Sequence, residues 1–360
     1  MNSLTSFRFI AALMVFVFHL EMFKQYQLGS AGVQFFFVLS GFILAYNYHS
    51  KFKELSNGNL KNFYRARFSK IYPVHILTFI IAIPLVVLTF KPDGLYFIKL
   101  AFMSTINLLL VQSFIPNEGT YFNFNGVSWT LSVEALFYLA FPFILIAFIK
   151  LRVIKNVLVS ILIVTLVWGL LFVLNANLDE NSDFFKWLLH IFPVIRLFEF
   201  STGILLGLIF TRKHHSDDFN KNNYSIVEAA CVAAFVMALW FSTKLDVGVV
   251  RGVYFVPIWC FLIYTFAFQR GVISKLLSVK PLVYLGEISF SFYMIHQLVI
   301  RYFNLMDMNL NIGYSFSICL GLSLILSAVM FKYYEEPMRK WLRFGAKKKE
   351  ENRVLLKTSA

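Results

Sequence analysis

Residues 31–48 read AGVQFFFVLSGFILAYNY, a run without a single charged side chain. A helix rises 1.5 Å per residue, so about twenty apolar residues cross the roughly 30 Å hydrocarbon core of a membrane. Comparable runs recur along the chain, in which 59% of the 360 residues are hydrophobic and 14% are charged. Soluble domains carry roughly 25% charged residues. The sequence therefore predicts an all-α, polytopic membrane protein and argues against a water-soluble domain.

The apolar runs predict ten membrane-spanning helices. They lie at residues 4–23, 31–48, 71–90, 127–149, 156–174, 190–210, 225–243, 252–268, 283–303 and 312–333. No small-residue cleavage site follows the first run, so we expect a retained helix there and not a signal peptide. A further apolar run, residues 96–114, begins after the segment KPDG and contains Lys99. We expect it to lie at the outer membrane surface or to re-enter, because another crossing would place the basic residues 150–155 outside.

The distribution of Lys and Arg predicts which side of the membrane each loop faces. Loops rich in these residues remain in the cytoplasm, and residues 49–70 carry Lys51, Lys53, Lys61, Arg65, Arg67 and Lys70. Both termini should therefore be cytoplasmic. We expect one membrane domain, residues 1–335, followed by a basic cytoplasmic tail, residues 336–360. These basic segments account for the formal charge of +14, so no nucleic-acid partner is expected.

Ionisable side chains inside spanning helices are candidates for function, because each costs about 3 kcal/mol unless it faces a cavity or a partner. Arg8 and His19 are eleven residues apart, which places them on one helical face and roughly 16 Å apart in depth. One helix would thus present a cation on the cytoplasmic side and an imidazole on the outer side. The alternatives are a snorkelling anchor for Arg8 and a hydrogen-bonded core histidine for His19.

Other buried charges are expected to be paired. Glu134 should lie about two turns below the outer surface, close to the depth of His19, where a carboxylate would orient the imidazole and raise its basicity. A purely structural ion pair between these two residues is the alternative. Arg196 and Glu199 are spaced i,i+3 and are expected to pair with each other.

Small and polar residues mark further positions within the expected bundle. Ser40 and Gly41 permit close approach of two helix backbones. Tyr293 and His296 place a phenol and a second imidazole in its middle or outer half.

The remaining polar and sulfur-containing residues give weaker signals. Arg67 and Lys70 form a basic cluster that suits the phosphates of a cytosolic donor, although topology alone also predicts basic residues at that edge. No CxxC spacing occurs, so neither a disulfide framework nor a metal site is expected from the three cysteines, Cys231, Cys260 and Cys319.

Taken in order along the chain, these motifs resemble acyltransferase family 3, the bacterial membrane O-acyltransferases that acetylate lipopolysaccharide, capsule and related glycans. Lys70 stands where the family has a second arginine, so the charge is kept and the bidentate geometry is lost. Phe290 replaces the usual tyrosine. The resemblance covers nearly the whole chain, and its motifs are Arg8-x10-His19, residues 36–42, Arg67-x-x-Lys70-Ile-Tyr72-Pro, Trp129-x-Leu-Ser-Val-Glu134-x-x-Phe-Tyr138, Arg196 to Gly203, and Gly286 to His296.

The resemblance implies an acyl-CoA donor, usually acetyl-CoA, that is reached from the cytoplasm of a bacterial cell. No permanently bound cofactor is implied. His19 would deprotonate the acceptor hydroxyl or carry the acyl group itself, with Glu134 orienting the ring. The implied donor-binding residues are Arg8, Arg67, Lys70 and Tyr72, and the further candidates are Ser40, Gly41, Trp129, Tyr138, Arg196, Glu199, Tyr293 and His296.

The acceptor implied by the resemblance is a glycan or lipid-linked saccharide at the outer side of the bacterial cytoplasmic membrane, in contact with membrane lipid. Many relatives carry a fused extracytoplasmic esterase-like domain. This chain is expected to lack one, and so to use a separate transferase or to deliver the acyl group directly, as a monomer or a homo-oligomer. Competing interpretations are a transporter of glycans or lipid-linked oligosaccharides, and a non-catalytic membrane scaffold.

Overall fold

The structure is a computed structural model that describes residues 1–360 except 53–55, 91–93, 180–181, 214–220, 308–309 and 346–360. Within these described residues it consists of helices joined by turns, without a strand. The helices are α1 Asn2–His19, α2 Leu28–Tyr48, α3 Asn57–Phe90, α4 Gly94–Leu108, α5 Glu118–Tyr121, α6 Trp129–Lys150, α7 Val157–Asn177, α8 Asp183–Lys186, α9 Pro193–Lys213, α10 Lys221–Ser242, α11 Val247–Gly252, α12 Val256–Ala267, α13 Val272–Leu277, α14 Lys280–Glu287, α15 Ser289–Leu305 and α16 Ile312–Met330.

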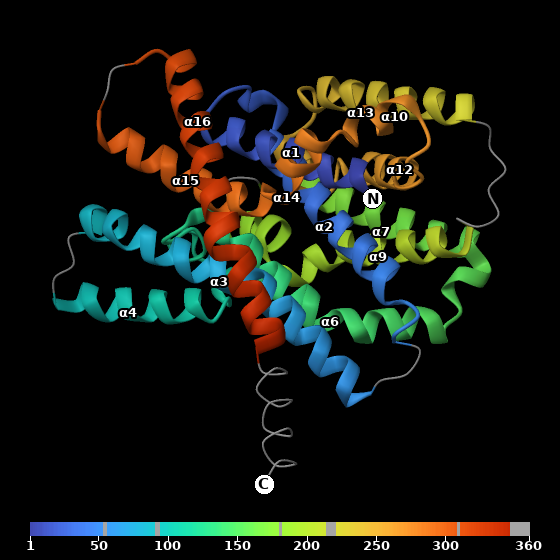
Figure 1. The fold of residues 1–360 in the computed structure, drawn as a ribbon, viewed down its shortest axis with the longest axis horizontal. Helices are drawn as coiled ribbons and strands as arrows, with labels where there is room; N and C mark the ends of the chain where they lie inside the picture. Colours follow the sequence, from blue (N-terminus) through green and yellow to red (C-terminus); the bar gives the residue numbers. More distant parts are fainter. Residues whose placement is uncertain (53–55, 91–93, 180–181, 214–220, 308–309, 346–360) are drawn as a thin grey trace, which may run out of the picture.

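The expected multi-pass membrane architecture is confirmed. In the described part of the chain, nine helical segments are long and apolar enough to cross a membrane, or ten if the bent pair α14 and α15 forms one span. Helices α7, α10 and α16 leave most of their apolar side chains exposed, as helices that face lipid do. Figure 1 shows α4 and the later part of α3 on one side of the molecule and α10 and α12 on the other.

Helix α4 agrees with the expectation that residues 96–114 do not cross. It contains 15 residues and is therefore about 22 Å long, less than the hydrocarbon thickness. After it the chain continues through short turns, one of which is the 3₁₀ turn Gln112–Phe114.

The expected continuous helix at residues 283–303 is wrong, because α14 and α15 meet at 63°. The bend follows Gly286, which packs so tightly on α1 that a Cβ atom there would collide with the backbone oxygen of Thr5. After the bend, the Ser289 hydroxyl donates to the Gly286 carbonyl at 2.8 Å. The bend lets α15 approach α1 along its length, which brings His296 toward His19.

The boundary expected at residue 335 does not coincide with a break in the helix. A π turn over Phe331–Glu335 follows α16, and helical structure continues to Gly345. The Nε atom of Arg65 donates to the Leu342 carbonyl at 2.6 Å, which ties this segment to α3. The rest of the expected tail, and residues 214–220 of an expected cytoplasmic loop, lie outside the described residues.

The core is built around α1 and α2. Helix α2 packs along α9, and α1 is surrounded by α2, α12, α13, α14 and α15. A Cβ atom on Gly41 would collide with the Phe200 carbonyl of α9, so this glycine permits the close α2–α9 approach that the sequence predicted. Because α1 is central, both Arg8 near its start and His19 at its end face cavities inside the bundle.

Candidate active site

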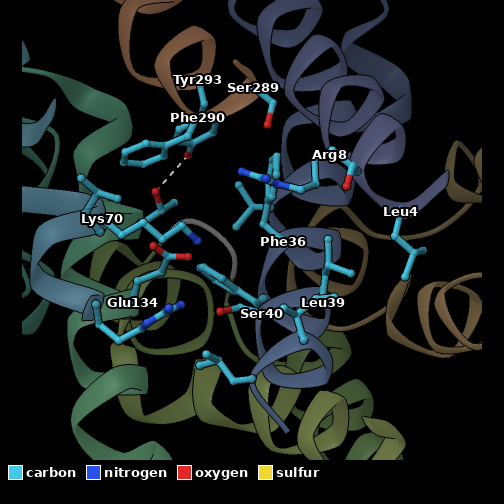
Figure 2. Close-up of a pocket in the computed structure, with 18 of the residues that line it drawn as sticks. Leu4, Arg8, Phe36, Leu39, Ser40, Lys70, Glu134, Ser289, Phe290 and Tyr293 are labelled. Carbon is cyan, nitrogen blue, oxygen red and sulfur yellow. Dashed lines mark hydrogen bonds between the residues drawn. The ribbon is translucent and has the colours of Figure 1, made fainter. Parts of the chain in front are cut away.

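The first cavity lies between α1, α2, α3, α6 and α15 and has a volume of about 270 Å³. Arg8, Lys70 and Glu134 point into it from three different helices, and Ser40 also lines it (Figure 2). Arg67 adds a third cation to the lining, and its guanidinium lies 5.8 Å from the centre of the Tyr138 ring. We call this space, with its Arg8, Arg67, Lys70 and Glu134, the Arg8 cavity. Its three cations suit a polyanionic ligand.

A second cavity, of about 330 Å³, lies beside His19. Trp129 and Arg196, two further residues singled out in the sequence, also line it. Tyr121 lies in its wall outside the spanning helices, and burial raises the pKa of its phenol to about 12, so this hydroxyl stays neutral near pH 7. We call this space the His19 cavity.

The two cavities adjoin. Val33 and Tyr293 line both of them, and the Tyr293 hydroxyl lies 3.1 Å from that of Thr130. Helix α1 runs without a break from Asn2 to His19, so Arg8 and His19 lie on one face of it, as their spacing predicted. Arg8 lines one cavity and His19 the other. Two compartments separated by a thin wall of side chains thus lie along one helix.

The expected pairing of Glu134 with His19 is not formed. Glu134 lines the Arg8 cavity, while His19 lines the other. The depth estimate failed because the chain before α6 is already inside the bundle: the Val127 amide donates to the Gln297 side chain at 3.0 Å, next to His296. Glu134 follows seven residues later, and so lies about 10 Å deeper along α6.

The neighbour of His19 is His296 of α15. Their Nδ1 and Nε2 atoms, respectively, are 3.2 Å apart. His19 Nδ1 also lies 2.9 Å from the Val15 carbonyl, and His296 Nδ1 lies 3.2 Å from the Phe292 carbonyl. A carbonyl only accepts hydrogen bonds, so each Nδ1 carries the proton and His296 Nε2 accepts from His19. This tautomer leaves His19 Nε2 unprotonated, as a general base requires.

Other predicted residues have structural roles or lie at the margins. Arg196 and Glu199 form the expected ion pair at 2.6 Å, and both are buried. Tyr72 lines neither of the two cavities, and its ring stacks on Phe68 with centroids 4.4 Å apart. Gly41 serves helix packing and does not line either space.

Sequence reasoning missed two charged residues, Glu335 and Arg251. Glu335 is buried and accepts a hydrogen bond from Ser291 at 2.5 Å, within electrostatic range of Arg8 and Lys70. No motif marks it, since it lies at the end of a long apolar helix. Arg251 lines the His19 cavity. Its position beside an apolar run is the sequence feature that could have identified it.

Comparison with known proteins agrees with this geometry. A family model described as an acyltransferase domain matches residues 1–332. Acyltransferase MdmB of Streptomyces mycarofaciens is 31% identical over 330 residues, covering 83% of this chain and 79% of MdmB. O-acetyltransferase OatA of Staphylococcus aureus is 24% identical over 349 residues, covering 94% of this chain but only 57% of OatA. No solved structure matches the chain significantly. The chain therefore belongs to acyltransferase family 3 and is a multi-pass membrane enzyme that transfers acyl groups.

Proposed function

We propose that the protein is a membrane O-acetyltransferase that moves an acetyl group from cytoplasmic acetyl-CoA to a hydroxyl of a cell-envelope or exported glycan, or of its lipid-linked precursor. The observation that carries this proposal is the arrangement of two adjoining cavities along α1, with Arg8 in one and His19 in the other. The name of the relative OatA, an O-acetyltransferase, supports an acetyl donor and a hydroxyl acceptor.

The Arg8 cavity is the proposed donor site. CoA carries several phosphate charges, and Arg8, Arg67 and Lys70 would bind them by charge-assisted hydrogen bonds. Arg8 and His19 are separated by roughly 16 Å along the helix. The extended pantetheine arm of CoA would bridge that distance and bring the thioester to Val33 and Tyr293, where the cavities adjoin.

The His19 cavity is the proposed acceptor site. His19 Nε2 would take the proton of the acceptor hydroxyl while the oxygen attacks the thioester carbonyl. The carbon–sulfur bond then breaks, and the CoA thiolate takes the proton from His19. The products are an O-acetyl ester and CoA with a free thiol, so protons and electrons balance without a further reactant.

A direct test uses the full chain purified in nanodiscs, together with cells that express or lack it. His19→Ala should abolish the acetyl mass shift of envelope glycans and the acetyl-CoA turnover of the purified protein, while acetyl-CoA binding persists because the donor cations lie in the other cavity. His49→Ala is the matched control, since His49 is the C-cap residue of α2 and lines neither cavity. Normal acetylation by His19→Ala would refute the assignment.

A further inference from the structure

Three cations gather around the His19 cavity. Lys186, Arg196 and Arg251 all line it, and all three lie within electrostatic range of His190 in the same wall. Among the lining residues that the structure describes, Glu118 supplies the only carboxylate. The described lining of the His19 cavity therefore carries three cations and one carboxylate.

Arg251 differs from the other two cations in having no acidic partner. Arg196 is paired with Glu199 at 2.6 Å, and Lys186 lies 3.6 Å from Asp183 at the exposed surface. In the described part of the chain no carboxylate forms an ion pair with Arg251. A guanidinium charge in a partly enclosed cavity costs free energy when no negative charge lies beside it. An anionic ligand would therefore fit this position.

The surrounding residues hold Arg251 in place. Its Nε atom donates to the Gln27 side-chain oxygen at 3.0 Å. The side-chain nitrogen of Gln27 in turn donates to the Lys24 carbonyl at 2.9 Å. The Arg251 carbonyl accepts from Gln34 at 3.2 Å and from Arg196 at 3.3 Å. Because Nε and the backbone are fixed, the two terminal nitrogens are available as a preorganised pair of donors.

We propose that Arg251, assisted by Lys186, binds an anionic group of the acceptor, a carboxylate or a phosphate. The planar fork of a guanidinium matches both groups in bidentate geometry. This inference rests on the proposed function, because the anion would be held in the cavity that contains His19 and would select which hydroxyl reaches its ring. The acceptor class is therefore an acidic sugar or a saccharide phosphate, and not a neutral glycan.

The test measures binding of three small glycosides to the purified full chain in nanodiscs by titration calorimetry. Methyl glucuronide presents a carboxylate, methyl glucoside 6-phosphate presents a phosphate, and methyl glucoside is their neutral counterpart. One of the two anionic glycosides should bind at least about tenfold more tightly than the neutral one. Whichever is preferred identifies the anion as carboxylate or phosphate.

Variants then assign the preference to Arg251. Arg251→Gln should remove it, and Arg251→Lys should restore part of it, since a lysine keeps the charge without the fork. Acetyl-CoA binding should be unchanged in both, which separates this proposal from the donor assignment. Lys244→Gln is the control, because Lys244 lies over the Trp240 ring and lines neither cavity.

Equal affinity for all three glycosides, binding of none of them, or an anion preference that survives Arg251→Gln would overturn the inference. The comparison of glycosides on the unmodified protein needs no variant, so it holds even if Arg251→Gln fails to fold. Acetyl-CoA turnover and glycan acetylation test the proposed function independently. If both persist while anionic and neutral glycosides bind alike, only the acceptor class is wrong.

Discussion

His296 Nε2 lies 3.2 Å from His19 Nδ1, so the ring of the proposed base contacts a second imidazole, from α15. Both rings are tied to backbone carbonyls of their own helices, Val15 for His19 and Phe292 for His296. This arrangement fixes the tautomer of His19 without a carboxylate. His296 is therefore a positioning residue in the proposed reaction.

The variant His296→Ala should lower kcat by about 10- to 100-fold, a part of the 10²–10⁴ that a general base supplies. The KM for acetyl-CoA should not change, because the donor cations lie in the Arg8 cavity. His296→Gln should recover part of the rate, since its side-chain oxygen can still accept from His19 Nδ1. Steady-state kinetics of both variants check this, and a glutamine variant as slow as the alanine one would contradict the positioning role.

Glu134→Gln should act on donor binding and not on the chemical step. Glu134 lines the Arg8 cavity and acts electrostatically on both Arg8 and Lys70, so its loss removes a negative charge that opposes the CoA phosphates. We expect the KM for acetyl-CoA to fall by up to about tenfold, or 1.4 kcal/mol, with kcat at saturating donor within about twofold. Glu287→Gln, an exposed acid on α14, is the control. A large loss of kcat at unchanged KM would restore Glu134 as the partner of His19.

Arg67 and Lys70 of the Arg8 cavity should each contribute to donor binding. Arg67→Gln and Lys70→Gln should each weaken acetyl-CoA binding by roughly 10- to 100-fold, the loss of one hydrogen bond to a charged group. Lys70→Arg should bind normally, because it keeps the charge. Calorimetric titration with acetyl-CoA measures these effects. Lys61→Gln removes an exposed charge of α3 outside the cavity, and if it weakens binding equally, the basic residues serve topology alone.

Gly41→Ala should destabilise the protein, because the new Cβ atom would meet the Phe200 carbonyl and the Ile204 amide nitrogen of α9. Overpacking of this kind costs about 1–3 kcal/mol and should lower the Tm measured in detergent. Gly321→Ala makes a matched comparison on α16, where no neighbour lies within 4 Å. It should leave the Tm unchanged or raise it slightly. Equal Tm values for the two variants would mean that α2 and α9 are not held this closely.

The orientation of the chain can be tested by labelling. In a variant whose native cysteines are replaced, Asp179→Cys should react with an impermeant thiol reagent added outside intact cells. Lys155→Cys, in the turn Val153–Asn156, should be protected, because basic loops remain in the cytoplasm. The reversed pattern would exchange the donor and acceptor sides.

The features predicted correctly from sequence are those that a single helix determines. The shared face of Arg8 and His19 follows from helical periodicity alone, and the pairing of Arg196 with Glu199 follows from their i,i+3 spacing. The family motifs identified the acyltransferase activity, and they included His296 without giving it a role.

The failures concern how one helix sits relative to another. Residue counting placed Glu134 at the depth of His19, but the segment around Val127 enters the bundle and shifts α6 along its axis. The bend before α15 depends on contact between Gly286 and Thr5, which are far apart in sequence. Arg251 and Gln27 meet only in the folded protein. Such tertiary relationships leave no periodic signal.

The wall that Val33 and Tyr293 form between the two cavities has an electrical consequence. If transfer proceeds as proposed, the acetyl group that leaves CoA is replaced on the thiol by the proton of the acceptor hydroxyl. CoA and the acceptor each keep their charge, so no net charge crosses this wall in a turnover. Moving one charge across the full membrane changes the free energy by about 2.3 kcal/mol per 100 mV. Acetylation avoids this term, and in sealed proteoliposomes a potassium diffusion potential should leave its equilibrium unchanged.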